Sequence, residues 1–151
     1  MKKAILVVFL LSVSISLAQK EDNSKLKWLT NLEQAQKIAK KKKQPILVYM
    51  TGSDWCSPCK MLKKDFFESE AFYARANDMV LVMIDRPRRM DIITEEQLAY
   101  NKKVIAKYNK ENTFPKLIML NAKGKEKGKI SGYSSLRDTT NHFAFLDKYG
   151  K

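Results

Sequence analysis

The residues of this sequence best suited to covalent chemistry are two cysteines, Cys56 and Cys59. They are the only cysteines among the 151 residues, and just two positions separate them. A disulfide between them would close a very short loop, so it would remove little conformational entropy from the unfolded chain. Exported domains that use disulfides for stability carry several of them, spread along the sequence. We therefore expect this pair to carry out thiol–disulfide chemistry.

Two other interpretations of the cysteine pair remain open. The pair could be half of a zinc site, but its further ligands would have to be His142 and carboxylates, and structural zinc sites are usually rich in cysteine. His142 lies in the last expected helix, where a structural role is the simpler interpretation. The pair could also be a passive local disulfide, because exposed thiols oxidise after export. We expect no metal at this site.

The cysteines lie between a buried strand and a helix of the predicted fold. Residues 46–49 are apolar without alternation, which is typical of a strand buried on both faces. A polar loop follows, and the helix after the cysteines is expected to turn Met61, Leu62 and Phe66 inward. Residues 79–84 form a second apolar strand. The pair is thus predicted at the mouth of the helix in a β-α-β unit.

Helix signals flank this unit on both sides. A capping box of Thr30 and Glu33 predicts the start of a helix that Pro45 ends. A second capping box begins at Thr94 and opens a helix that lasts to about Asn109. A short strand is expected around Trp28.

The C-terminal part adds two strands and a helix. Residues 116–120 and 127–130 are predicted strands joined by a hairpin turn at 121–124. The last helix is expected over roughly residues 136–148, packing Leu136, Phe143 and Leu146 into the core. The fold class is therefore α/β, with a mixed central sheet of four to five strands and helices on both faces.

The N-terminus has the three-part layout of a secretory signal peptide. Lys2 and Lys3 precede an apolar stretch from Ala4 to Leu17, and Ser16-Leu17-Ala18 supplies a small-x-small cleavage pattern. The stretch is shorter than the ~20 residues of a membrane-spanning helix, which disfavours the alternative of an uncleaved anchor. We expect a signal peptide at residues 1–18, a flexible lead-in at 19–27 and one domain at 28–151. After cleavage we expect no stable membrane insertion.

The chain is strongly basic, with a formal net charge of +13 that falls by two to +11 without Lys2 and Lys3. Such a charge could favour binding to nucleic acid, to an anionic membrane surface or to acidic partner proteins. The lysines are interleaved with acidic residues, and no nucleic-acid-binding signature accompanies them. A solvated basic surface is the favoured interpretation, with no nucleic acid as partner.

The run Trp55-Cys56-Ser57-Pro58-Cys59-Lys60 closely resembles the active site of the thioredoxin superfamily. The resemblance extends over most of the chain, from about Trp28 to Lys148, in the family's order of strands and helices. Cys56 is expected as the first residue of its helix, where the helix dipole and free N–H groups stabilise a thiolate. The resemblance implies that Cys56 is the nucleophile and Cys59 the resolving cysteine, with no cofactor beyond the pair.

The resemblance also implies roles for residues around the pair. Pro115 is expected to form a cis peptide bond opposite Cys56, beside which an extended substrate segment can pair with the backbone. Trp55 and Phe114 either flank the sulfur and contact substrate or pack in the core. Ser57 and Pro58 support the pair, and Pro58 fits the first helical turn because its missing N–H is not needed there.

Two departures from the family pattern affect the mechanism and the surface. Residues 45–50 contain no buried aspartate and residues 79–84 contain no lysine, so the proton acceptor for Cys59 is unassigned. The segment 86–100 is longer than a small thioredoxin needs. It forms either a partner-binding rim or, as we favour, a solvated insertion.

These observations together predict a bacterial periplasmic thiol–disulfide oxidoreductase that acts as a monomer on protein or peptide disulfides. Ser57-Pro58 resembles the Gly-Pro of reducing thioredoxins more than the Pro-His of strong oxidants, which favours a reductant. A reductant in an oxidising compartment needs an electron donor, expected to be a membrane partner. The alternative is a non-catalytic module that uses a thioredoxin fold to bind extended peptides.

Overall fold

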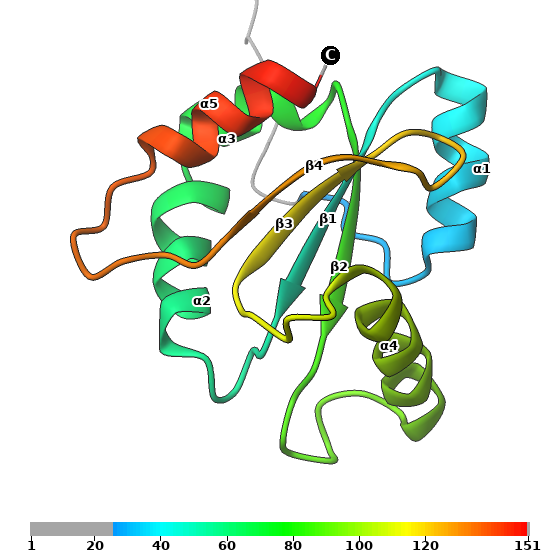
Figure 1. The fold of residues 1–151 in the computed structure, drawn as a ribbon, viewed down its shortest axis with the longest axis vertical. Helices are drawn as coiled ribbons and strands as arrows, with labels where there is room; N and C mark the ends of the chain where they lie inside the picture. Colours follow the sequence, from blue (N-terminus) through cyan, green and yellow to red (C-terminus); the bar gives the residue numbers. More distant parts are fainter. Residues whose placement is uncertain (1–25, 151) are drawn as a thin grey trace, which may run out of the picture.

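Four strands form the mixed sheet at the centre of the molecule (Figure 1). The computed structural model describes residues 26–150. In space the strands follow the order β2-β1-β3-β4, with β1 parallel to β2 and antiparallel to β3, and β3 antiparallel to β4. Their bounds are Ile46–Thr51 for β1, Val80–Asp85 for β2, Lys116–Leu120 for β3 and Glu126–Ser131 for β4. The predicted fold class is confirmed.

The burial of each strand follows from its place in the sheet. All six residues of β1 and all five of β3 are buried, as expected of continuous apolar runs at the centre. Strand β4 lies at the edge, and Glu126, Lys127 and Lys129 on it are exposed. Charged side chains on an edge strand discourage pairing with another chain.

Helices cover both faces of the sheet (Figure 1). One face carries α1 (Leu32–Lys42) and α4 (Glu95–Tyr108). The other face carries α2, the π-helical turn η1, α3 and α5. Their bounds are Ser57–Leu62 for α2, Lys63–Phe67 for η1, Glu70–Ala76 for α3 and Thr140–Tyr149 for α5. Among the helices of residues 26–150, none has the length and apolar character needed to cross a bilayer.

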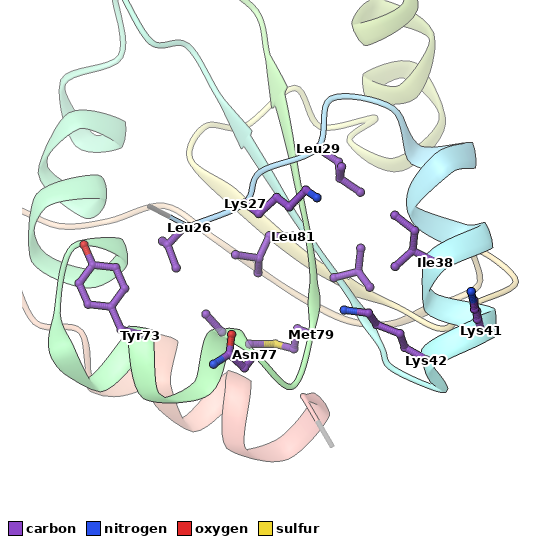
Figure 2. A pocket seen from close by; sticks show the side chains of 12 residues that line it. Leu26, Lys27, Leu29, Ile38, Lys41, Lys42, Tyr73, Asn77, Met79 and Leu81 are labelled. Atoms are coloured by element: carbon purple, nitrogen blue, oxygen red, sulfur yellow. The ribbon is translucent and has the colours of Figure 1, made fainter. Parts of the chain in front are cut away.

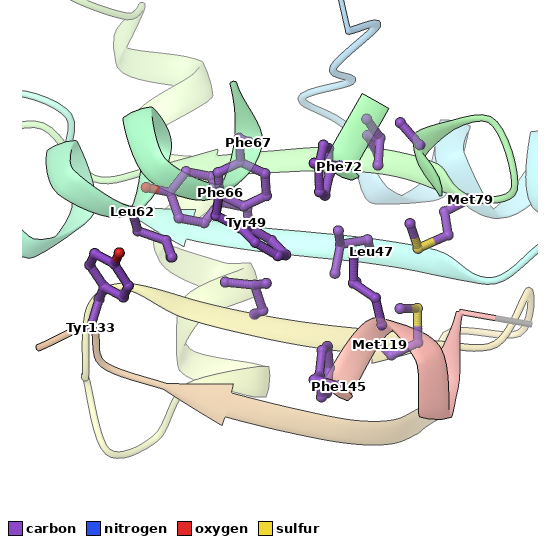
Figure 3. Close-up of a cluster of buried hydrophobic side chains, with 14 residues drawn as sticks. Leu47, Tyr49, Leu62, Phe66, Phe67, Phe72, Met79, Met119, Tyr133 and Phe145 are labelled. Carbon is purple, nitrogen blue, oxygen red and sulfur yellow. The ribbon is translucent and has the colours of Figure 1, made fainter. Parts of the chain in front are cut away.

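Alternation along the strands divides the core into two clusters. Leu47, Tyr49 and Met119 point to one face and pack against the helices that follow the cysteine pair (Figure 3). Phe66 is fully buried there among the rings of neighbouring aromatic residues, which are Phe67, Phe72, His142 and Phe143. The even-numbered residues of β1 point the other way, against α1 and α4. The helix that begins after Cys56 is thus anchored by this aromatic cluster.

Two predicted helix starts are wrong. Asn31 caps α1 by accepting a hydrogen bond from the N–H of Gln34, so the Thr30 and Glu33 capping box does not form. The final helix begins at Thr140, and Leu136 is 87% exposed instead of packed. Arg137 in the preceding segment forms an ion pair with Asp65, and this contact holds the segment outside the helix.

The helix predicted after the cysteines forms up to Phe67, and it is followed by a further helix that was not predicted. The chain forms α2 and η1, the helical stretch ends at Glu68, and α3 then begins at Glu70. Ser69 caps α3, because its hydroxyl accepts from the N–H of Phe72. By contrast, Thr94 caps α4 as predicted, through the N–H of Gln97.

The predicted signal peptide and most of the predicted lead-in fall in residues 1–25, which lie outside the described residues. Leu26, which was assigned to the flexible lead-in, is half-buried and packs against the aromatic cluster. The strand expected around Trp28 is reduced to one parallel bridge between Leu29 and Val82. Leu26 is therefore packed as part of the domain.

Candidate active site

The two cysteines are joined in a disulfide just past the end of β1, with their Cα atoms 5.2 Å apart. Cys56 is the N-cap of α2, not its first helical residue as predicted, because its backbone is extended. The N–H of Cys56 donates to the carbonyl of Gly52 at 2.8 Å, which holds Cys56 in the turn before the helix. Pro58 occupies the first turn, as expected.

The helix start directs a donor at the first sulfur. The N–H of Cys59 donates to Sγ of Cys56 at 3.3 Å. A hydrogen bond to the sulfur, together with the positive end of the helix dipole, favours a thiolate once the disulfide is reduced. Cys56 is 4% exposed and Cys59 is 1% exposed. Cys56 is therefore the better placed of the two to act as nucleophile.

The loop before the cysteines is fastened to the end of β2 by Asp85. The Ser53 N–H and hydroxyl both donate to the buried carboxylate of Asp85, at 2.9 and 2.5 Å. The carbonyl of Asp85 accepts from the side-chain amide of Asn101 at 2.7 Å. Asp85 is thus a positioning residue that sequence reasoning missed. Its only signal is that it ends an apolar strand at the level of the cysteine loop.

Trp55 and Phe114 meet beside the disulfide. Their rings are in edge-to-face contact, with centroids 5.6 Å apart, and both residues are half-buried. The indole N–H of Trp55 donates to the carbonyl of Arg86 at 2.7 Å. A Cβ atom at Gly52 would lie 2.3 Å from the Trp55 ring, so this position needs a glycine for the ring to pack. Trp55 therefore combines a packing contact with partial exposure.

Pro115 lies at the same end of the sheet as the cysteine loop. Met50 of β1 pairs with Lys116 of β3, which places Pro115 level with Thr51. The Phe114–Pro115 peptide bond is cis. The carbonyl of Pro115 accepts from the N–H of Gly132 at 2.8 Å, so Pro115 is also tied to the residue that follows β4.

An ion pair between a buried lysine and an exposed glutamate anchors the segment that leads to Pro115. The Lys116 side chain is 1% exposed, and its ammonium lies 2.6 Å from the Glu111 carboxylate. Lys129 contacts the same carboxylate at 3.2 Å. Hydrogen bonds from Lys116 and Lys129 hold the pKa of Glu111 at about 2. Lys116 and Glu111 therefore both stay charged at neutral pH, and their ion pair fixes the turn before Pro115.

Comparison with known proteins shows the family to which this chain belongs. Residues 32–147 match the family model described as a thioredoxin-like domain. The chain belongs to the thioredoxin-like family. The resemblance of the Trp-Cys-Ser-Pro-Cys run is thereby confirmed at the level of the whole domain.

This thioredoxin-like domain has two similar proteins in Chlamydia pneumoniae. Thioredoxin-related protein DsbJ is 28% identical over 156 residues, covering 95% of this chain and 43% of that protein. Disulfide bond reductase DsbH is 32% identical over 102 residues, covering 67% of this chain and 60% of that protein. The chain thus spans about half the length of the curated relatives it matches.

Solved structures agree on the fold. The structure of DsbH oxidoreductase superposes with a TM-score of 0.68 and 27% identity, covering 87% of this chain and 88% of that one. Oxidised thioredoxin O2 from Arabidopsis thaliana gives a TM-score of 0.56 at 20% identity, covering 85% of this chain and 96% of that one. The second likeness shows the fold alone.

Tyr49 lies beneath the redox pair of the thioredoxin-like domain and was missed by sequence reasoning. Its hydroxyl donates to the carbonyl of Cys59 at 3.1 Å, which ties the first turn of α2 to β1. Burial raises the pKa of Tyr49 to about 12, so the phenol stays protonated at neutral pH. Tyr49 therefore holds the helix in place and does not accept the proton of Cys59.

His142 belongs to the aromatic cluster of the thioredoxin-like domain. It is buried in α5, with its ring 5.6 Å from Phe66 and 5.5 Å from Tyr133, and burial lowers its pKa. Within residues 26–150, no three side chains of His, Cys, Asp or Glu gather as metal ligands would. The described residues therefore offer the cysteines no zinc ligand set.

A cavity of about 750 Å³ lies away from the disulfide of the thioredoxin-like domain (Figure 2). Its walls come from α1, α3, β2 and the segment before α1, and include Leu29, Ile38, Tyr73 and Leu81. Neither Cys56 nor Cys59 lines it. The cavity is therefore separate from the cysteine pair.

Proposed function

We propose that this thioredoxin-like domain is a thiol–disulfide oxidoreductase that acts on protein disulfides through Cys56 and Cys59. The observation that carries the proposal is the placement of the pair at the start of α2, with the Cys59 N–H donating to Sγ of Cys56. That donor stabilises a leaving or attacking thiolate at Cys56. The names of the two relatives, a disulfide bond reductase and a thioredoxin-related protein, support the same chemistry.

The proposed reaction begins with both cysteines reduced. The Cys56 thiolate attacks one sulfur of a substrate disulfide, forms a mixed disulfide and releases the other substrate sulfur as a thiolate that takes up a proton. Cys59 then attacks Sγ of Cys56, and the proton that Cys59 gives up is taken up by the departing substrate sulfur. The Cys56–Cys59 disulfide forms and the second substrate thiol leaves, so two electrons pass from the pair to the substrate. A dithiol donor must then reduce the pair.

The substrate is proposed to lie across Trp55, Phe114 and Pro115. These residues come together at one end of the sheet, level with the loop that carries the cysteines. An extended substrate segment would pair with the backbone beside Pro115 and rest on the two rings. Ser57 and Pro58 support the pair by shaping the first turn of α2.

Two arguments favour a reductant. Ser57-Pro58 resembles the dipeptide of reducing thioredoxins, and one relative is named a disulfide bond reductase. The cysteine pair would need no further cofactor, because the two sulfurs hold the electrons themselves. A membrane protein with a dithiol would then supply electrons in the periplasm to the monomeric domain.

The proposal requires that the protein is exported to the periplasm. The mature protein is expected to begin at Gln19, because Ser16-Leu17-Ala18 is the small-x-small pattern that ends the apolar stretch. Intact-mass measurement of the periplasmic fraction should show the loss of residues 1–18. Soluble protein that keeps Met1 would refute both the cleavage and the periplasmic location.

Insulin reduction with dithiothreitol as donor tests the proposed function. The wild-type protein should accelerate precipitation of the insulin B chain, and Cys56→Ser should abolish that acceleration because the remaining thiol, Cys59, is buried. Ser135→Ala is the matched control, since it changes an exposed serine in the loop before α5 and should keep turnover. Binding of insulin without any turnover by the wild type would instead assign a non-catalytic peptide-binding module.

A further inference from the structure

Residues 86–93 between β2 and α4, here called the rim segment, lie against the loop that precedes the cysteines. In Figure 1 the rim segment is the long connection at the same end of the sheet as the start of α2. The N–H of Arg86 donates to the carbonyl of Thr51 at 2.9 Å, and the Arg86 carbonyl accepts from the Trp55 indole. The rim segment is therefore fixed beside the redox pair and is not a detached insertion.

Asp54 adds a second attachment. Its carboxylate accepts from the backbone N–H of Arg88 at 3.0 Å and from that of Arg89 at 2.9 Å. These bonds occupy the carboxylate with backbone groups, so the arginine side chains are turned to other partners. Arg89 pairs with Asp91, and Arg86 donates to the side chain of Asn112 at 2.7 Å.

Arg88 is the cation of the rim segment that faces the redox pair. Its guanidinium lies over the Trp55 ring, 4.9 Å from the centroid, and Trp55 directly precedes Cys56. Among the ion pairs formed within residues 26–150, none includes Arg88. A guanidinium that lies over an aromatic ring can still donate its N–H groups to a carboxylate.

The rim segment also exposes large apolar side chains. Met90 is 62% exposed and Ile92 is 38% exposed. Exposed apolar side chains beside a cation suit a partner segment that carries both a carboxylate and apolar residues. Continuity with Trp55 and Phe114 places such a segment where the proposed substrate lies.

We propose that the rim segment selects substrates: protein disulfides flanked by acidic and apolar residues, with Arg88 pairing with the substrate carboxylate. This inference rests on the proposed function, because it assigns a substrate class to the same redox site. Arg88 would then be a specificity-determining residue, and Met90 and Ile92 would contact the apolar flank.

Two disulfide-linked peptides that differ only in Glu-Leu or Lys-Leu beside one cysteine test the proposal. The kcat/KM of the wild type should be about fivefold higher for the Glu peptide at low ionic strength, the effect of one exposed ion pair, and the ratio should approach one in high salt. Arg88→Gln should bring the ratio to one, Arg88→Lys should keep most of it, and Arg88→Glu should invert it. Lys103→Glu on exposed α4 is the matched charge control and should leave the ratio unchanged.

Equal kcat/KM for the two peptides in the wild type, or an unchanged ratio in Arg88→Gln, would overturn the recognition surface. A second outcome would also overturn the proposal: the wild type binds anionic phosphatidylglycerol vesicles, Met90→Ser/Ile92→Ser does not, and the peptide ratio is one. The exposed surface would then be assigned to membrane binding. If neither peptide is reduced, the proposed function fails separately. Binding of uncleavable thioether versions of the peptides to Cys56→Ser/Cys59→Ser then decides the proposal: tighter binding of the Glu peptide supports it, and equal binding overturns it.

Discussion

Phe66→Ala is expected to destabilise the domain by about 3–5 kcal/mol, the usual range for removing a buried aromatic ring. The Phe66 side chain is fully buried, next to Phe67 and Phe72 (Figure 3). Its ring centroid lies 5.0 Å from those of Phe67 and Phe72 and 4.7 Å from that of Phe143. The substitution would leave a cavity between η1, α3 and α5. Because η1 continues directly from α2, the helix that starts at the redox pair would lose its main anchor.

Thermal unfolding followed by circular dichroism measures this effect. The midpoint should fall by roughly 10–20 °C, since 1 kcal/mol corresponds to about 3–5 °C in a domain of this size. Leu136→Ala is the matched control, because its side chain is 87% exposed and its loss should change stability by less than about 0.5 kcal/mol. A Phe66→Ala midpoint within a few degrees of the wild type would show that the cluster does not anchor the helix.

The sheet could be predicted from the sequence because its central strands are long apolar runs. Residues 46–49 and 116–120 have no polar alternation, and such runs are typical of strands buried on both faces. The cysteine pair could be predicted for a similar reason: both sulfurs, the proline between them and the helix start are adjacent in sequence. Patterns among neighbouring residues were sufficient wherever the structure is decided by interactions between residues close in sequence.

The wrong helix starts depend on contacts between distant residues. Thr30 and Asn31 are both good N-cap residues, so propensity alone does not choose between them. The structure chooses Asn31 because the hydroxyl of Tyr100 accepts from the N–H of Leu32, while the carbonyl of Thr30 accepts from the side chain of Gln97. Both contacts come from α4, more than sixty positions along the chain.

The residues that position the candidate site were hidden for the same reason. Asp85 acts on Ser53 across 32 positions, and Trp55 binds the carbonyl of Arg86 across 31 positions. The role of the rim segment depends on these bonds, so its length alone did not distinguish a solvated insertion from a surface beside the redox pair. Tyr49 was assigned to the core, and only the fold shows its hydroxyl beneath Cys59.

Cys59→Ser is expected to accumulate mixed disulfides with substrates. Cys56 keeps its position at the helix start and can still attack, but a serine hydroxyl is too weak an acid to act as the second nucleophile. The mixed disulfide therefore persists, whereas in the wild type Cys59 resolves it. Cys56→Ser is the matched control and should trap little, because the remaining Cys59 is 1% exposed.

The most direct test of the roles of Cys56 and Cys59 is a non-reducing gel of periplasmic extracts that contain each variant. The account predicts a ladder of covalent complexes for Cys59→Ser that collapses to free protein under dithiothreitol, and almost none for Cys56→Ser. Equal trapping by the two variants, or trapping by neither while the wild type reduces insulin, would contradict it.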